Sequence, residues 1–176
     1  MRCPNCGAQN TDGAYCSNCG AALLTGELPE AEQQLVRRNV SYYARRFAPM
    51  RSGKVLSWNW AAFFLGPLWL SYRKMTIPTL VSVFLLEGTF WFDKLWSAPL
   101  LMLLIGALGN WVYYRYVRFW SVVCATRPAE QLEQAFARRG GTSILGATAT
   151  AALIIALALW WMRFFSHAAV LFSIRG

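Results

Sequence analysis

Residues 57–75 read SWNWAAFFLGPLWLSYRKM, and this stretch decides how the rest of the chain is arranged. From Trp58 to Tyr72 it holds fifteen largely apolar residues, interrupted by Gly66 and Pro67. A helix needs roughly twenty apolar residues to cross a bilayer. The stretch is therefore either a short or kinked span, or a hairpin that enters the membrane and returns to the same side.

The whole chain is more apolar than an ordinary soluble domain. Of its 176 residues, 56% are hydrophobic and 14% are charged, whereas roughly a quarter of the residues of a soluble domain are charged. A soluble fold of this size would leave apolar runs such as 100–107 and 154–161 partly wet. We therefore expect a mainly α-helical integral membrane protein that is embedded in the lipid bilayer.

Three further apolar runs are predicted membrane spans: 77–92, 98–114 and 143–162. The basic residues indicate how residues 57–75 are threaded, because cytoplasmic loops carry the excess of Lys and Arg. If these residues re-enter, all 17 basic residues except Lys94, Arg163 and Arg175 lie inside. If they cross fully, seven basic residues move outside, namely Arg73, Lys74, Arg115, Arg118, Arg127, Arg138 and Arg139. The sequence thus favours three full spans plus one short or re-entrant helix.

Two cysteine motifs occupy residues 1–22. They are the C-x-x-C-G units Cys3-Pro4-Asn5-Cys6-Gly7 and Cys16-Ser17-Asn18-Cys19-Gly20. Each turn points two thiolates into one site, and each glycine is expected to take a positive φ that closes the turn. Four thiolates complete a tetrahedral site with no open position, so the metal is structural and supplies the folding energy of this small ribbon. We predict Zn²⁺ bound by Cys3, Cys6, Cys16 and Cys19.

Two disulfides or a redox pair are the competing interpretation of these cysteines. A redox C-x-x-C is expected beside a strand–helix unit, and disulfides need an oxidising compartment. No apolar leader precedes the cysteines, so we expect a cytoplasmic N-terminus, where zinc thiolates persist. Arg2 is the only basic residue of this segment, so no nucleic acid partner is expected. The segment resembles the short zinc ribbons at the N-termini of many bacterial membrane proteins.

Residues 23–56 are predicted to form a linker and a basic amphipathic helix, before a helical membrane domain over residues 57–176. The helix is expected from Glu30 to Phe47, with apolar residues at helical spacing and four arginines beside them. It either lies on an anionic leaflet or packs on a neighbouring subunit or the inner loops. A short cytoplasmic helix is also predicted over residues 127–139, ended by Gly140 and Gly141, with Thr142 or Ser143 capping the last span.

Two motifs within residues 57–120 carry a family resemblance. The first motif is Trp58-Asn59-Trp60-Ala61-Ala62-Phe63-Phe64, followed by Gly66-Pro67, Trp69 and Tyr72-Arg73-Lys74-Met75. The second motif is Gly106-Ala107-Leu108-Gly109-Asn110-Trp111, followed by Tyr113-Tyr114-Arg115. They are similar to motifs of the bacterial membrane-protein family catalogued as domain of unknown function 2628. The resemblance implies an inner-membrane helical protein, often preceded by a zinc ribbon, and implies no activity.

Few polar residues fall within the predicted spans. Glu87 lies about 15 Å into its run at helical rise, and an ionisable group at that depth is a candidate functional group. It is either a proton or substrate relay, or a carboxyl that stays protonated or reaches outward, where Lys94 could pair with it. Asn110, beside Gly106 and Gly109, is expected to hydrogen-bond across a close helix contact.

The sequence contains no set of paired titratable groups, so we predict no catalytic residue and no enzyme activity. The favoured function is a non-enzymatic anchor, scaffold or sensor of the bacterial inner membrane, which recruits a protein partner through the ribbon at the cytoplasmic face. The alternative is a small channel or transporter with a polar path near Glu87 and Asn110. A stripe of small residues in the last span favours a homo-oligomer, and its members are Gly146, Ala149, Ala152 and Ala156.

Overall fold

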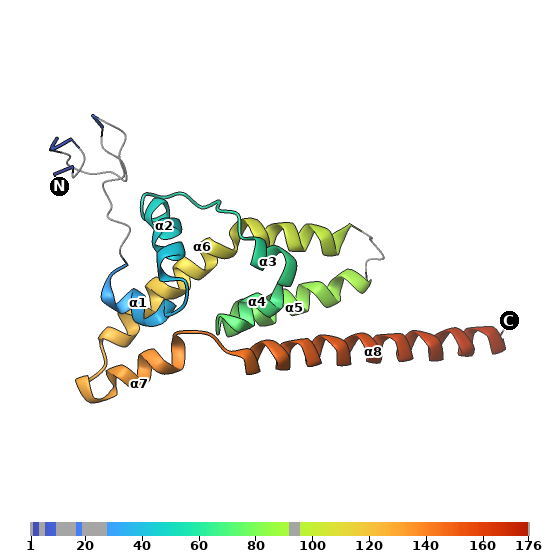
Figure 1. Cartoon of the computed structure of the whole chain (residues 1–176). Coiled ribbons are helices and arrows are strands. Elements are labelled where there is room, and N and C mark those ends of the chain that lie inside the picture. The colour runs from blue at the N-terminus through green and yellow to red at the C-terminus, as the bar shows by residue number, and fades with distance from the viewer. Residues whose placement is uncertain (1, 4–5, 10–16, 19–27, 92–95, 176) are drawn as a thin grey trace.

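The computed structural model shows a mainly α-helical protein (Figure 1). It describes residues 2–3, 6–9, 17–18, 28–91 and 96–175. The helices within these ranges are α1 (Glu30–Val36), α2 (Val40–Arg51), α3 (Trp60–Leu65), α4 (Pro67–Tyr72), α5 (Thr76–Trp91), α6 (Ser97–Ala125), α7 (Ala129–Arg139) and α8 (Ile144–Arg175). Arg2 and Gln9 form an isolated antiparallel bridge, and these described ranges contain no strand.

Helix α6 is the element on which most of the others pack. Its N-terminal half lies beside α5, and α1, α2 and α7 gather around its C-terminal half (Figure 1). We call α1, α2 and α7 the collar. The core of the protein is formed where the collar meets α6, by buried residues that include Leu35, Phe47, Tyr113, Val117, Cys124 and Phe136. The best-packed part of the protein therefore lies at one end of α6.

The predicted single helix from Glu30 to Phe47 is wrong, because the structure divides it into α1 and α2. Arg37 and Asn39 between the two helices have positive φ angles of 55° and 61°. A positive φ is outside the right-handed helical region, so the helix must stop there. An ion pair of 2.7 Å between Arg51 Nη2 and Glu32 Oε2 joins the two helices.

The apolar stripe of this segment packs on the rest of the chain. Tyr43 and Phe47 of α2 are buried, and their rings lie 4.9 Å and 5.9 Å from that of Tyr113 on α6. The structure therefore shows this stripe packed on α6 of the same chain, and not on the inner loops or a neighbouring subunit as one of the two predictions had it.

Residues 57–75, which we call the hairpin, contain two short helices that turn back at Gly66. The predicted break is confirmed, because α3 ends at Leu65 and α4 begins at Pro67. Gly66 has a φ of 47°, a conformation that favours glycine. Pro67 occupies the first turn of α4, where its missing N–H is not needed.

Both ends of the hairpin lie closer to the collar than its turn does. The N–H of Asn59 donates to the carbonyl of Gly106 at 2.8 Å, whereas Gly66 lies against the side chain of Met102. On the return, the hydroxyl of Tyr116 donates to the carbonyl of Lys74 at 3.1 Å. The hairpin therefore lies along the part of α6 between residues 102 and 116. At helical rise this part is about 20 Å long.

The segment before the last helix forms as predicted. Helix α7 covers Ala129–Arg139, and Gly140 is its C-cap. The side-chain oxygen of Ser143 accepts a hydrogen bond of 2.9 Å from the N–H of Gly146. Ser143 therefore caps the start of α8.

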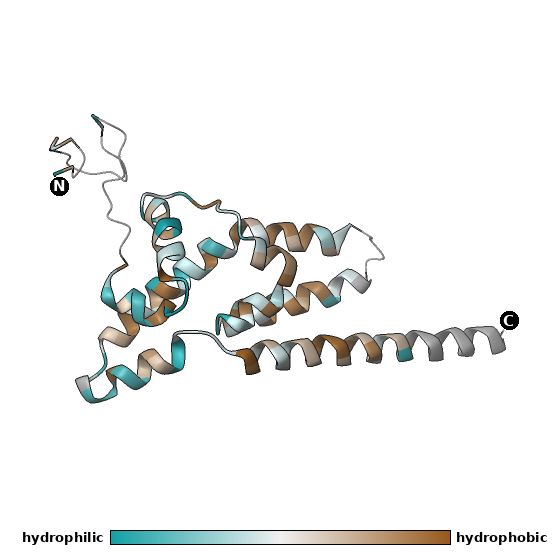
Figure 2. Ribbon diagram, viewed as in Figure 1, coloured by the Kyte–Doolittle hydropathy of each residue, from teal (hydrophilic) through white to brown (hydrophobic). Residues whose placement is uncertain are grey.

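Most of the exposed large apolar side chains belong to α3, α5, the N-terminal half of α6 and α8, and the ribbons of α5 and of the first part of α8 contain much apolar sequence in Figure 2. The exposed side chains include Phe64, Ile77, Leu80, Phe84, Leu100, Leu104, Leu145, Ile155 and Leu159. Two helices, α6 and α8, are long and apolar enough to cross a membrane. Helix α5 has 16 residues, fewer than the roughly twenty of a straight crossing. Two of the three predicted spans therefore meet the length requirement in the structure.

Candidate functional site

Two buried asparagines fasten the hairpin to α6. The side-chain oxygen of Asn59 accepts from the N–H of Ala62 at 3.1 Å and so caps α3. Its Nδ2 donates to Oδ1 of Asn110 at 2.9 Å, and Nδ2 of Asn110 donates to the hydroxyl of Ser57 at 3.1 Å. The hydrogen bond expected of Asn110 is confirmed. The role of Asn59 was missed, although an Asn before an apolar run is a signal for a helix cap.

Glycines let the hairpin approach α6 closely. A Cβ atom added to Gly106 would lie 2.8 Å from Cβ of Phe63, and one added to Gly109 would lie 2.9 Å from Cβ of Ala62. Both separations are shorter than an ordinary van der Waals contact. The glycines of the second motif are therefore the surface on which the first motif packs.

Arg73, which follows α4, is buried beneath the collar and is 3% exposed. Its guanidinium carbon lies 4.6 Å from the ring centroid of Tyr43 and 5.1 Å from that of Tyr113. Nη1 donates to the carbonyl of Val36 and to the hydroxyl of Tyr113, both at 3.4 Å, and Nη1 and Nη2 both donate to the carbonyl of Arg38 at 3.5 Å. Among the residues that the structure describes, no carboxylate pairs with Arg73 and its Nε has no hydrogen-bond partner.

The positive charge of Arg73 is not neutralised by the rings around it. A guanidinium group stays protonated in proteins, and burial raises the pKa of Tyr43 to about 12 against the opposing effect of the Arg73 charge. Tyr43 is therefore neutral at physiological pH. A cation–π contact contributes about 1–2 kcal/mol, which offsets only part of the several kcal/mol that desolvating an unpaired ion costs. The carbonyls of Val36 and Arg38 accept hydrogen bonds from Arg73 but carry no negative charge, so the site keeps a net positive charge.

A cavity of about 530 Å³ lies beside Arg73. Helix α2 contributes Tyr42 and Arg46 to its wall, and the hairpin contributes Trp58, Trp60 and Arg73 itself. The indole Nε1 of Trp58 is also buried without a partner among the described residues. The residues that line the cavity include two arginines and no Asp or Glu, so its charged lining is entirely positive and is set among aromatic and aliphatic side chains.

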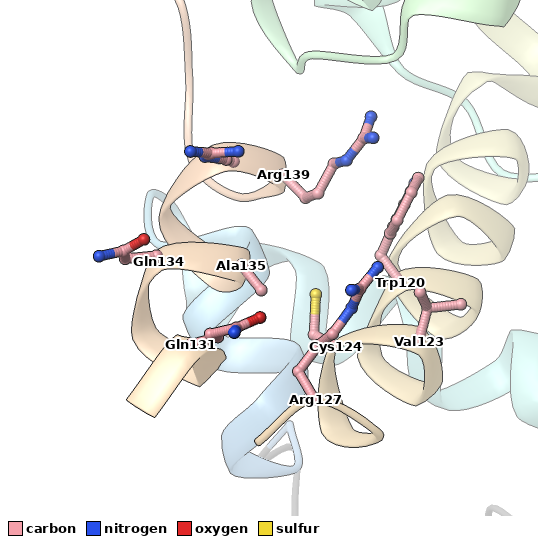
Figure 3. Close-up of a pocket in the computed structure, with 9 residues that line it drawn as sticks. Trp120, Val123, Cys124, Arg127, Gln131, Gln134, Ala135 and Arg139 are labelled. Carbon is pink, nitrogen blue, oxygen red and sulfur yellow. The ribbon is translucent and has the colours of Figure 1, made fainter. Parts of the chain in front are cut away.

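A second basic cavity, of about 490 Å³, lies between the end of α6 and α7 (Figure 3). The guanidinium carbon of Arg139 lies 3.9 Å from the ring centroid of Trp120, and Cys124 beneath it is buried, as the sequence indicated. The three arginines of this cavity are exposed, namely Arg127, Arg138 and Arg139. Their charges are hydrated, so this cavity lacks the buried charge that distinguishes the site at Arg73.

Glu87 and Asn110 do not meet in the structure. Both carboxylate oxygens of Glu87 are buried, and no described residue forms a hydrogen bond with them. Its proposed partner Lys94 lies outside the described residues. The hydrogen-bond partners of the Asn110 side chain are Tyr42 and residues 57–59, and none comes from α5.

The structure describes only part of the predicted zinc ribbon. Cys3 is buried and Cys6 is exposed, and Gly7 has the expected positive φ, of 74°. Nδ2 of Asn18, from the second C-x-x-C unit, donates to the sulfur of Cys6 at 3.7 Å, so this part of the second unit lies beside the first. Cys16 and Cys19 lie outside the described residues, and those described contain no cluster of three candidate metal ligands. The zinc site remains a prediction.

Comparison with models of protein families found none that matches the chain, and no curated protein or solved structure matches it either. The family resemblance of the motifs in residues 57–120 therefore stays a prediction.

Proposed function

We propose that this chain is a non-enzymatic scaffold of the bacterial inner membrane, which holds a collar and a zinc ribbon at the cytoplasmic surface so that the ribbon binds a protein partner. The observation that carries this proposal is the division of the molecule into two ends. Buried residues concentrate where the collar meets α6, and exposed apolar side chains surround the opposite half. Such a division matches a protein of which one end is in water and the other in lipid.

In this arrangement α6 and α8 cross the membrane, and the hairpin enters it from the cytoplasmic side and returns. Helix α5 also crosses as a short span, since its 16 residues cover about 24 Å of the roughly 30 Å hydrocarbon core. The turn at Gly66, and the position of both hairpin ends toward the collar, support re-entry. Backbone that turns back at membrane depth must be covered by protein, and the contacts of Asn59, Gly106 and Gly109 provide that cover.

The contacts of Asn110 favour a scaffold over a channel. A polar path would need an amide that remains available to water or substrate, whereas Asn110 is fully buried and bonded to the hairpin. Its role is to fasten two elements together.

A homo-oligomer remains part of the proposal. Gly146 packs within the chain, since a Cβ atom there would lie 3.1 Å from the hydroxyl of Ser71. Ala149, Ala152 and Ala156 are exposed on α8, so these small residues are available to a second copy.

Cysteine variants test whether the ribbon binds a partner. The described core contains no residue before Leu28, so replacing Cys3 and Cys16 by Ser should leave membrane insertion and helix content unchanged. Binding of the partner that co-purifies in mild detergent should be lost together with about one bound zinc ion per chain. Zinc content is measured by elemental analysis and the partner by quantitative mass spectrometry.

The matched control is Cys124→Ser, which removes a thiol from α6 and none from the ribbon. This variant should keep both zinc and partner. Retention of the partner by the Cys3→Ser/Cys16→Ser variant would contradict the proposal.

A further inference from the structure

We propose that the cavity beside Arg73 binds a phosphate anion carried by the headgroup of an anionic phospholipid. The inference rests on the membrane placement proposed above and adds a ligand to it. Its basis is an arginine that is almost completely buried and has no counter-ion among the described residues.

The positive charge of the cavity favours an anionic ligand. Arg73 and Arg46 both line it, and no Asp or Glu does. Buried charges in proteins are normally paired, and the rings that surround Arg73 supply no negative charge. A phosphate oxygen can accept several hydrogen bonds and pairs well with guanidinium groups.

The unpaired hydrogen-bond donors point to the same ligand chemistry. Among the described residues, the buried side-chain donors without a partner are Nε of Arg73 and Nε1 of Trp58. Both residues line this one cavity. The site therefore has an excess of donors, and a ligand that contains only acceptors, such as a phosphodiester, complements it.

The edge of the cavity favours a lipid as the source of the phosphate. Trp60 and Leu65 line the cavity and are 63% and 50% exposed. They belong to the hairpin, which the proposed threading places in the membrane. Indole rings favour the headgroup layer, so a ligand with a charged head and an apolar tail matches both parts of the cavity.

A lipid titration of the full chain in neutral detergent tests this inference. Short-chain phosphatidylglycerol should raise the thermal unfolding midpoint in a saturable manner, whereas phosphatidylcholine should not, because its positive choline group faces two arginines. Arg46→Gln should weaken the apparent affinity for phosphatidylglycerol about tenfold.

Arg45→Gln is the matched control, since Arg45 is also exposed on α2 and does not line the cavity. It should bind phosphatidylglycerol as the wild-type protein does. Arg73→Met should abolish the lipid-induced shift. Its unfolding midpoint in lipid-free detergent is measured beside that of the wild-type protein, because the substitution removes an unpaired charge but also the hydrogen bonds to Val36 and Tyr113. If Arg73→Met fails to fold, the comparison of Arg46→Gln with Arg45→Gln still tests whether the lipid binds in this cavity.

Three outcomes would overturn the inference: no shift with phosphatidylglycerol, an equal shift with phosphatidylcholine, or equal losses in Arg46→Gln and Arg45→Gln. An equal shift with inorganic phosphate would keep the phosphate site and overturn the lipid as its source. Membrane placement is measured separately, by reporter fusions, so failure here is distinguishable from failure of that placement.

Discussion

At the scale of single residues, the hydrogen bond between Asn59 and Asn110 is expected to contribute to stability. Asn110→Ala leaves the Nδ2 group of Asn59 without its buried acceptor. An unpaired buried polar group costs about 1–3 kcal/mol, so we expect a loss of this size in the free energy of unfolding, measured by denaturing-detergent titration and circular dichroism. Thr148→Ala is the control, because Thr148 is exposed and bonds only within its own helix. An equal effect of both substitutions would contradict the role of Asn110.

The sequence indicates the role of some residues and hides that of others. Asn110 stands next to Gly106 and Gly109, so a buried bond at a close contact could be predicted from its neighbours. Arg73 could not be recognised, because it stands beside Lys74 at the end of an apolar run and resembles an ordinary topology signal. Its burial depends on Tyr43 and Tyr113, which are distant in sequence and come from different helices.

At the scale of elements, the contact between the hairpin and α6 depends on the absence of a side chain at Gly109. Gly109→Ala places a methyl group 2.9 Å from Cβ of Ala62, and overpacking of this kind typically costs about 1–3 kcal/mol. The expected result is an unfolding midpoint lower than that of the wild-type protein, with faster proteolysis of the hairpin.

Gly88→Ala is the matched control for this prediction. No atom lies within 4 Å of a Cβ built at Gly88, and alanine is the better helix former by about 1 kcal/mol. The variant should be as stable as the wild-type protein or slightly more stable. If Gly109→Ala behaves like Gly88→Ala, the hairpin does not pack on α6 as described.

Elements bounded by Gly and Pro were predictable, whereas the break between α1 and α2 was not. Gly66 with Pro67, and Gly140 with Gly141, have local geometries that end a helix whatever surrounds them. The break between α1 and α2 falls at Arg37 and Asn39. Asn adopts a positive φ comparatively readily, whereas Arg needs tertiary contacts to hold one. The apolar residues of α2 that are buried against α6 provide such contacts. The local sequence pattern around Arg37 and Asn39 does not indicate them.

At the scale of the whole molecule, the threading is tested by reporter fusions. Reporters placed after Lys74 and Arg139 should be cytoplasmic, and those placed after Lys94 and Gly176 should lie on the other side. This pattern follows from keeping the largest number of Lys and Arg residues inside. An external reporter after Lys74 would show that residues 57–75 cross completely, and the scaffold proposal would then need a different orientation.

Composition and the length of the apolar runs were enough to predict a helical chain with membrane-length segments. They could not show that α6 extends through the collar to Ala125, because its second half is amphipathic and mixes Arg with Tyr, Trp and Phe. The packed end of the molecule exists only because α1, α2 and α7 meet on that extension. Contacts of this kind join helices that are distant in sequence, so the spacing of apolar residues within one helix cannot predict them.

The bond between Asn59 and Asn110 joins positions 51 residues apart, which has a consequence for biosynthesis. At a translation speed of about 5–20 residues per second, the ribosome needs roughly 3–10 s to add the partner of Asn59. During that interval the nascent hairpin has emerged but has no surface on which to dock. In the proposed membrane placement the insertion machinery or the lipid shelters it until α6 arrives, and the contact then forms by the return of an early segment to a later one.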